Sequence, residues 1–215
     1  PNLDKMVKNG VFFENAYNSG AWQGAVCMAS RTMLMLGKQL WDAHKYYDDQ
    51  VRNPADFWST YLKRRGYKTY FTGKWHVRAN VEKCFDVTSN IRGGMPNQTP
   101  AGYNRPLPDQ PDPWSPYDEK FEGFWKGGKH WSEVVADDTL DFFSSAKKHQ
   151  KDYPFFAYVA FNAPHDPRQA PKSFIDRYPL DRIKVPQNFL AHYPYMDGIK
   201  APHSLRDENL GPMPR

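Results

Sequence analysis

The chain has 215 residues, of which 40% are hydrophobic and 16% aromatic, and its formal net charge is +5. This length and apolar content suit one α/β domain, or one large lobe of a bigger domain, and exclude an intrinsically disordered chain. The sequence has no run of about eighteen apolar residues, so we expect no membrane span. The lysines and arginines are scattered rather than clustered in a stripe, so we expect no nucleic-acid partner.

The first expected element is a short amphipathic helix over residues 3–9, whose apolar side chains share one face and which Gly10 ends. Residues 11–17 contain two adjacent phenylalanines and a tyrosine, which predicts a strand or an extended approach to a loop. The loop that follows is built of small residues and leads to Cys27.

Cys27 is predicted to lie in the turn before a helix over residues 30–36, which ends at Gly37. Side chains at such a turn meet free amide groups and the positive end of the helix dipole, which favour anions. Arg31 lies one turn further on and can lean back over the same place. Two interpretations stay open at this point: Cys27 is a small buried hydrophobe, or it is a reactive side chain in an anion site. With only Cys84 as a second cysteine, no disulfide framework is indicated.

A helix, a glycine and a strand follow in the order of half a βαβ crossover. Residues 54–65 predict a helix with one apolar face, and residues 67–72 predict a strand. The strand leads directly into Gly73-Lys-Trp-His, and functional side chains in open α/β sheets collect just past strand ends. Lys74 and His76 are two residues apart, so they share one side of an extended backbone. They are either two binding groups or a surface lysine beside a partly buried histidine.

Residues 89–131 are rich in proline, glycine and aromatic residues and show no periodicity, which predicts an irregular functional insert. Its aromatic side chains either stack on the faces of sugars or pin the insert to the body of the domain. The aromatic residues in question are Tyr103, Trp114, Trp125 and Trp131.

Residues 131–148 predict the clearest helix of the chain. Ser132 is the expected N-cap, acidic residues fill the first half, and two lysines end the helix, in agreement with its dipole. Asp137 and Asp138 form an acidic pair in the middle of the helix. We expect both to be solvated and neither to be a metal ligand.

A nearly continuous apolar run over residues 154–161 predicts a parallel strand that is buried on both faces. It leads into Asn162-Ala-Pro-His-Asp-Pro, where two prolines restrict the backbone on either side of His165. His165 is either a functional group or a histidine of a surface turn. Residues 170–215 are proline-rich without strong periodicity, and two histidines there, His192 and His203, are interpreted as incidental.

Three of these segments resemble the hallmarks of the sulfatase family, and they occur in the family's order. Cys27-Met-Ala-Ser-Arg31 resembles the signature Cys-x-Pro/Ala-x-Arg, Gly73-Lys-Trp-His76 resembles the second hallmark, and Ala163-Pro-His-Asp-Pro167 resembles the third. The resemblance runs from residue 1 to about residue 194. It implies the alkaline-phosphatase-like fold, an α/β/α sandwich around a mostly parallel sheet, incomplete in this chain. Residues 1–215 are then part of one catalytic domain.

The resemblance also implies the chemistry of the site residues. The family's cysteine is converted to formylglycine, so Cys27 would become the nucleophile and, as a diol, a ligand of one Ca²⁺ ion. Arg31 and Lys74 would neutralise the substrate's charge, and Lys74 would bind the sulfate. His76 would take a proton from the diol, and His165 would bind the ester oxygen and protonate the leaving group. A formylglycine-generating or sulfatase-maturating enzyme is the implied partner.

Two parts of the family pattern are expected outside this chain. An Asp-Asp pair should precede Pro1, and an Asp-Asn pair with a further sulfate-binding lysine should follow Arg215, to which residues 170–215 would lead. Calcium prefers six or more oxygen ligands, and this chain would supply only the diol of residue 27. The sequence is therefore interpreted as an internal fragment of a sulfatase, inactive on its own.

The expected function is hydrolysis of a sulfate ester, and the aromatic insert favours a sulfated carbohydrate as the substrate. One alternative is a phosphonate or phosphodiester hydrolase of the same superfamily, because the three motifs do not separate sulfur from phosphorus. A second alternative is a non-catalytic, sulfatase-like carbohydrate-binding protein. Export to a periplasmic, secreted or lysosome-like location is expected by analogy only, since sulfated polymers lie outside cells.

Overall fold

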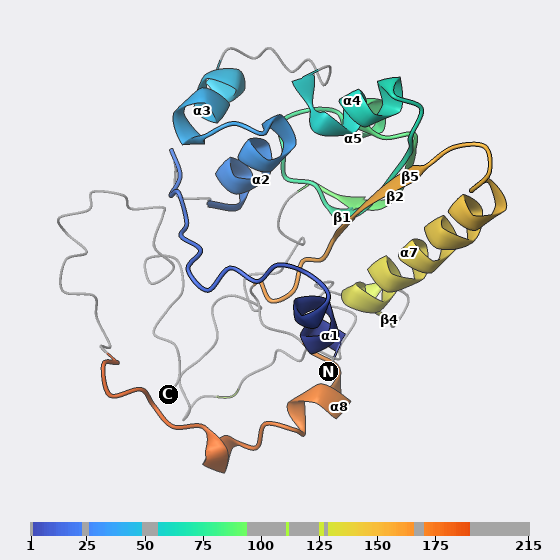
Figure 1. Ribbon diagram of the computed structural model, residues 1–215. Coiled ribbons are helices and arrows are strands. Elements are labelled where there is room, and N and C mark those ends of the chain that lie inside the picture. The colour runs from blue at the N-terminus through green and yellow to red at the C-terminus, as the bar shows by residue number, and fades with distance from the viewer. Residues whose placement is uncertain are drawn as a thin grey trace.

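The computed structural model describes residues 2–22, 26–48, 56–93, 111, 125–126, 129–165 and 170–189. Its centre is a parallel sheet of order β2-β1-β5, formed by β1 (Lys68–Lys74), β2 (Val87–Arg92) and β5 (Phe155–Ala160) (Figure 1). The aromatic and β-branched residues of the central strand suit a pleated, buried surface. The expected α/β architecture around a parallel sheet is confirmed.

Helices lie on both sides of this sheet, which makes three layers (Figure 1). Of the described helices, the long helix α7 (Trp131–Lys148) packs on one face of the sheet. The other side carries four shorter helices: α2 (Val26–Leu36), α3 (Leu40–Asp48), α4 (Trp58–Arg64) and α5 (Val81–Cys84). Because α7 precedes β5 in the chain and packs along it, its N-terminus lies at the edge of the sheet where the parallel strands end.

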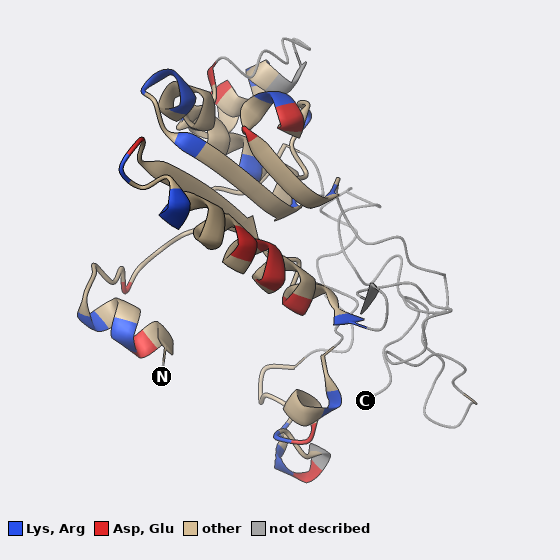
Figure 2. Cartoon of the chain, turned by 90° about the vertical axis from the view of Figure 1, so that its right-hand side faces the viewer, with Lys and Arg blue, Asp and Glu red and all other residues tan. Residues whose placement is uncertain are grey.

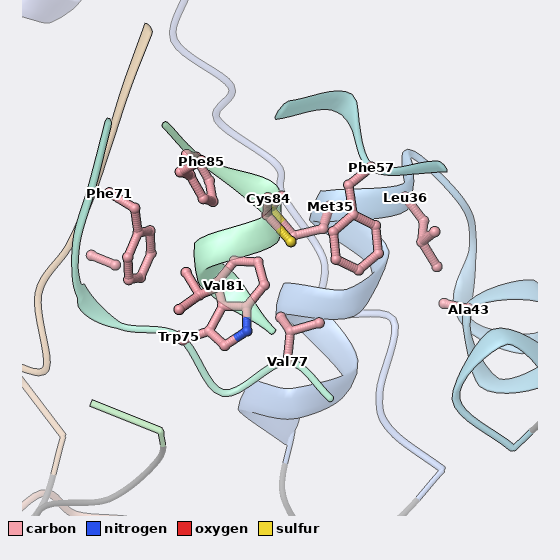
Figure 3. Close-up of a cluster of buried hydrophobic side chains, with 11 residues drawn as sticks. Met35, Leu36, Ala43, Phe57, Phe71, Trp75, Val77, Val81, Cys84 and Phe85 are labelled. Carbon is pink, nitrogen blue, oxygen red and sulfur yellow. The ribbon is translucent and has the colours of Figure 1, made fainter. Parts of the chain in front are cut away.

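The main hydrophobic core lies between the sheet and the shorter helices. Figure 3 shows its side chains meeting between β1, α5 and α2. The buried residues of this cluster are Met35, Leu36, Ala43, Phe57, Phe71, Trp75, Val77, Val81, Cys84, Phe85 and Ala160. On the opposite face, Tyr70 packs against Phe142 and Ala146 of α7. The side chains of β1 therefore alternate between two cores, as expected of a strand that is buried on both faces.

The remaining described elements are short. They are α1 (Asn2–Lys8), the two-residue strands β3 (Trp125–Lys126) and β4 (Lys129–His130), α8 (Lys172–Ile175) and the 3₁₀ helix η3 (Leu180–Arg182). Residues 11–17 form no strand, so the first of the two alternatives for this segment is wrong. In the part of the chain that the structure describes, no helix is long and apolar enough to cross a membrane.

Part of the expected insert belongs to the core of the domain. Residues 89–92 form the second half of β2, which pairs with β1 from Tyr70↔Val87 to Lys74↔Arg92. The prediction that residue 89 begins an irregular segment is therefore wrong. Of the four aromatic residues singled out there, Trp131 is buried at the start of α7 and pins the end of the segment to the domain. Tyr103 and Trp114 lie outside the described residues, as do the histidines at positions 192 and 203.

Helix α7 has the predicted bounds but differs from the prediction at two positions. Its N-cap is His130 rather than Ser132, because the His130 ring accepts a hydrogen bond from the Ser132 amide while Glu133 reaches back to the His130 amide. Asp138 is buried rather than solvated. It accepts hydrogen bonds from the hydroxyls of Thr72 (2.5 Å) and Ser89 (2.9 Å), so it joins α7 to both strands above it. Figure 2 colours the acidic residues of this helix red and its basic residues blue.

Candidate active site at the carboxyl edge of the sheet

The carboxyl end of β1 is shaped by a glycine and a bulge. β2 carries one extra residue, Asn90, between its pairing with Thr72 and its pairing with Gly73. Gly73 has a φ of 96°, and a Cβ atom there would clash with the backbone carbonyl of Ala160 on β5. Only glycine lets β1 stay against β5 while its last residues turn toward the edge of the sheet.

Cys27 and His76 meet at this edge. The Cys27 sulfur lies 3.1 Å from Nδ1 of the His76 ring. Because α2 begins at Val26, Cys27 lies inside the first turn of the helix. The prediction that Cys27 lies in the turn before the helix is therefore wrong. His76 has a φ of 49°, in the left-handed region that non-glycine residues rarely adopt. Such strain is typical of functional sites, and here it belongs to the backbone that carries the imidazole against Cys27.

Arg31, one turn after Cys27 on α2, joins the helix to two strands. One of its guanidinium nitrogens donates to the backbone carbonyl of Lys74 (2.6 Å) and to the hydroxyl of Tyr158 on β5 (3.2 Å). These bonds hold the cation of Arg31 next to the end of β1. The contact with Tyr158 has no counterpart in the motifs, because a tyrosine within an apolar run looks like an ordinary core residue.

The site concentrates positive charge in a buried place. Lys74 is only 2% exposed, and burial lowers the pKa of its ammonium group, while the neighbouring Cys27 raises it and Arg31 lowers it further. Burial also lowers the pKa of His76, to about 4, and the charges of Lys74 and Arg31 act in the same direction. His76 is therefore a neutral imidazole at neutral pH and can accept a proton.

His165 lies in the turn after β5, where its amide donates to the carbonyl of Asn162 (2.9 Å). Since Gly73 of β1 pairs with Ala160 at the end of β5, this turn lies at the same edge of the sheet as Lys74 and His76. His165 thus shares the edge with the other four predicted residues.

The described residues do not fit a metal centre by themselves. Within these ranges, no group of three or more His, Cys, Asp or Glu residues could hold a metal ion. Of the groups around Cys27, Arg31 and Lys74 are cations and repel a metal.

A three-layer α/β domain with cations and a histidine gathered beyond the ends of its parallel strands is typical of enzymes that act on a small anion. A family model described as Sulfatase matches residues 1–198, so the chain belongs to the sulfatase family. The alkaline-phosphatase-like fold expected from the sequence agrees with this membership and with the parallel sheet. The family as a whole implies a formylglycine residue and a metal ion.

Curated relatives support the same family. Human iduronate 2-sulfatase is 26% identical over an alignment that covers 100% of this chain and 42% of the relative. Human N-acetylgalactosamine-6-sulfatase is 27% identical, with 81% of this chain and 36% of the relative covered. An ulvan-active sulfatase of Formosa agariphila is 25% identical, with 98% and 40% covered. The chain thus spans about two fifths of the length of these relatives.

Proposed function

We propose that the protein to which this chain belongs hydrolyses sulfate esters, with residues 1–215 as part of its single catalytic domain. The observation that carries the proposal is the contact between Cys27 and a neutral His76 beside the cations of Arg31 and Lys74. A sulfuryl group is a small tetrahedral anion, and this place offers it positive charge, a proton acceptor and one reactive side chain.

Residue 27 is the proposed nucleophile. If a maturating enzyme oxidised Cys27 to formylglycine, the hydrated aldehyde would carry two hydroxyls. One would attack sulfur as the ester oxygen leaves, and the other, once deprotonated, would re-form the aldehyde as the C–O bond to the bound sulfate breaks. A thiol lacks the second hydroxyl that this release needs. The position in the first turn of α2 supports the proposal, because the unpaired amides there favour an oxyanion.

Arg31 and Lys74 are proposed to neutralise the negative charge on the sulfuryl oxygens during the transfer of the sulfuryl group. Both cations are fixed before the substrate arrives, Arg31 by its two hydrogen bonds and Lys74 by burial. Charges that are already oriented in a place with little water stabilise a transition state more than flexible surface charges do.

Two histidines are proposed to move the protons. His76, neutral and 3.1 Å from the sulfur of Cys27, takes the proton of a hydroxyl on residue 27. His165, in the turn after β5, donates a proton to the ester oxygen as its bond to sulfur breaks, so that the leaving group departs as a neutral alcohol. One calcium ion is the proposed metal, held by residue 27 and by ligands outside the described residues.

A sulfated carbohydrate is the proposed substrate class, and an exported location is proposed with it. The names of several relatives refer to carbohydrates: iduronate, N-acetylgalactosamine and ulvan. This chain covers only about two fifths of the length of these relatives, so no particular sugar is proposed for it.

The test uses the complete protein, produced together with a maturating enzyme. Mass spectrometry of the peptide that contains residue 27 should find formylglycine, and an aryl sulfate should be turned over faster than an aryl phosphodiester. Cys27→Ala should abolish turnover, whereas Cys84→Ala, a change of a buried core cysteine, should leave it intact. Full activity with an unmodified Cys27 would refute the formylglycine account, and a preference for the phosphodiester would refute the sulfatase assignment.

A further inference from the structure

A third cation reaches the same edge of the sheet from the neighbouring strand. Arg92 is the last residue of β2 and pairs in register with Lys74, the last residue of β1. Its carbonyl accepts a hydrogen bond from the amide of Trp75 (2.7 Å), so the two strand ends stay tied together beyond the bulge. Neighbouring strands lie about 4.8 Å apart, so the Cα atoms of the paired residues Arg92 and Lys74 are separated by about the width of one sugar ring.

The guanidinium of Arg92 is mounted on an aromatic platform. Its central carbon lies 4.0 Å from the centroid of the Trp131 ring, at the N-terminus of α7. Trp131 is itself only 4% exposed and packs against Val134 and Val135, so the platform is rigid. A guanidinium that stacks by its face keeps the N–H groups of its edge directed outward for hydrogen bonds.

The acids nearest to Arg92 along α7 have other partners. Glu133 accepts from the amide of His130, Asp137 pairs with Lys129, and Asp138 accepts from Thr72 and Ser89. Within the described ranges no ion pair includes Arg92, and burial lowers the pKa of its guanidinium. A half-buried cation without a carboxylate is costly, and an anionic ligand would offset that cost.

We propose that Arg92, backed by Trp131, is a second anion-binding position that takes a carboxylate or a second sulfate of the same substrate. The inference rests on the proposed function for its role in catalysis and deepens it: the substrate class is a carbohydrate with an anionic group next to the sulfate ester. Arg92 touches the non-reacting anion and therefore determines specificity, while the reacting group lies at Lys74.

The first experiment compares Arg92→Gln with the wild type in the complete, matured protein. The probes are three disaccharides that share one sulfate ester: a form with no other charge, a form with a carboxylate and a form with a second sulfate. Arg92→Gln should raise KM about tenfold for one or both dianionic forms, the usual scale for one charge-assisted hydrogen bond, and leave kcat nearly unchanged. The monosulfated form should be unaffected, and the affected arm identifies the group that Arg92 binds.

The matched control is Arg64→Gln. The guanidinium carbon of Arg64 also lies over an aromatic ring, 5.6 Å from the centroid of Tyr61. Arg64 is, however, the last residue of α4, which leads into the amino end of β1, so it lies at the opposite edge of the sheet. It should change none of the three KM values. Arg92→Lys keeps the charge and loses the forked geometry, so it should raise KM less and only for the dianionic forms. Equal KM values for wild type, Arg92→Gln and Arg92→Lys on both dianionic forms would overturn the inference.

A binding measurement separates this inference from the proposed function. Titration calorimetry of the same disaccharides against the inactive Cys27→Ala protein, with and without Arg92→Gln, needs no turnover. Weaker binding of the dianionic forms to the double variant supports the anion position even if no sulfate ester is hydrolysed. Unchanged binding overturns it even if the wild type proves to be an efficient sulfatase.

Discussion

The two edges of the central sheet treat charge in opposite ways. At the amino edge, Asp86 accepts hydrogen bonds from the amide and the hydroxyl of Thr69 (both 2.9 Å) and pairs with Lys63 (3.2 Å). At the carboxyl edge three cations gather, and in the described part of the chain none of them pairs with a carboxylate. These cations are Arg31, Lys74 and Arg92.

The difference indicates which edge serves stability and which serves function. A buried cation without a counter-ion lowers the stability of the folded state, so we expect a protein to keep such a cation where its function requires it. The amino edge is satisfied within the chain, so its charges hold β1 to β2 and α4. The carboxyl edge is left electrostatically incomplete, and an anionic substrate would complete it.

The largest expected effect comes from Lys74→Met, which removes the most deeply buried of these cations. We expect kcat/KM for a sulfate ester to fall about 10²–10³-fold, the scale for one preorganised charge or donor at a reacting oxygen. The melting temperature should stay unchanged or rise, because the methionine fills similar space without a buried charge. Steady-state kinetics and thermal unfolding of the complete protein measure both quantities.

Lys63→Met is the matching change at the amino edge. It removes the partner of Asp86, so it should lower the melting temperature and leave kcat/KM intact. If Lys63→Met costs activity, or if Lys74→Met costs stability and spares activity, the contrast between the two edges does not hold.

The second prediction concerns the turn that forms the carboxyl edge. Gly73→Ala places a methyl group against the carbonyl of Ala160 at a positive φ, so we expect a loss of about 3 kcal/mol in unfolding free energy. Gly66→Ala is the control, since Gly66 also has a positive φ (83°) but open space around its Cβ position. Its loss should be about 1 kcal/mol. Denaturant unfolding of both variants would contradict the steric explanation if the two losses were equal.

The sequence predicts well those elements whose pattern is visible in one segment. Helix α7 has the predicted bounds, and β5 lies within the predicted run, because each shows its own periodicity over its whole length. Strand β2 is missed because Val87-Thr-Ser-Asn-Ile-Arg is mostly polar and includes a bulge residue, so only its pairing with β1 defines it. That error carries over to Asp138, whose burial depends on the hydroxyl of Ser89 in the missed strand.

The same reason limits what the sequence could say about the site. Cys27, Arg31, Lys74, His76 and His165 are predicted from local motifs, and their roles remain predictions that await the experiments above. Tyr158 and Arg92 have no local motif. Tyr158 lies within an apolar run, and only the pairing of β2 with β1 shows that Arg92 lies beside Lys74.

The third prediction tests how firmly Arg31 is held. Tyr158→Phe removes the hydroxyl that accepts from Arg31 and keeps the ring that packs on Phe71 and Phe85. We expect kcat/KM to fall about tenfold, the equivalent of one hydrogen bond to a charged group, with kcat more affected than KM. Tyr70→Phe is the control: its hydroxyl meets Ser145 on the α7 side of the sheet, and its loss should not change the kinetics. Equal kinetics for wild type and Tyr158→Phe would mean that the bond to Lys74 alone positions Arg31.

The smallest expected effect belongs to the amino edge and depends on pH. Burial alone would raise the pKa of Asp86, but the hydrogen bonds from Thr69 and the charge of Lys63 outweigh it and hold that pKa below its ordinary value of 3.8. A depressed pKa contributes stability that is present above the unfolded value and is lost as pH falls through the folded one. Asp86→Asn should therefore cost about 1 kcal/mol at pH 7, and the difference from wild type should shrink as the pH falls below about 4.

Asp176→Asn sharpens this last comparison, because Asp176 pairs with Lys172 (2.5 Å) at a site where both side chains are more than half exposed. An exposed pair of this kind contributes little, so its loss should be within about 0.5 kcal/mol at every pH. Denaturant unfolding between pH 3 and pH 7 measures both variants. A constant difference between Asp86→Asn and wild type across that range would show that the carboxylate of Asp86 acts through its shape and hydrogen bonds and not through its charge. The charge of Asp86 would then not contribute to the stability of the amino edge. The two edges would differ in that packing and hydrogen bonds stabilise the amino edge, whereas charge defines the carboxyl edge.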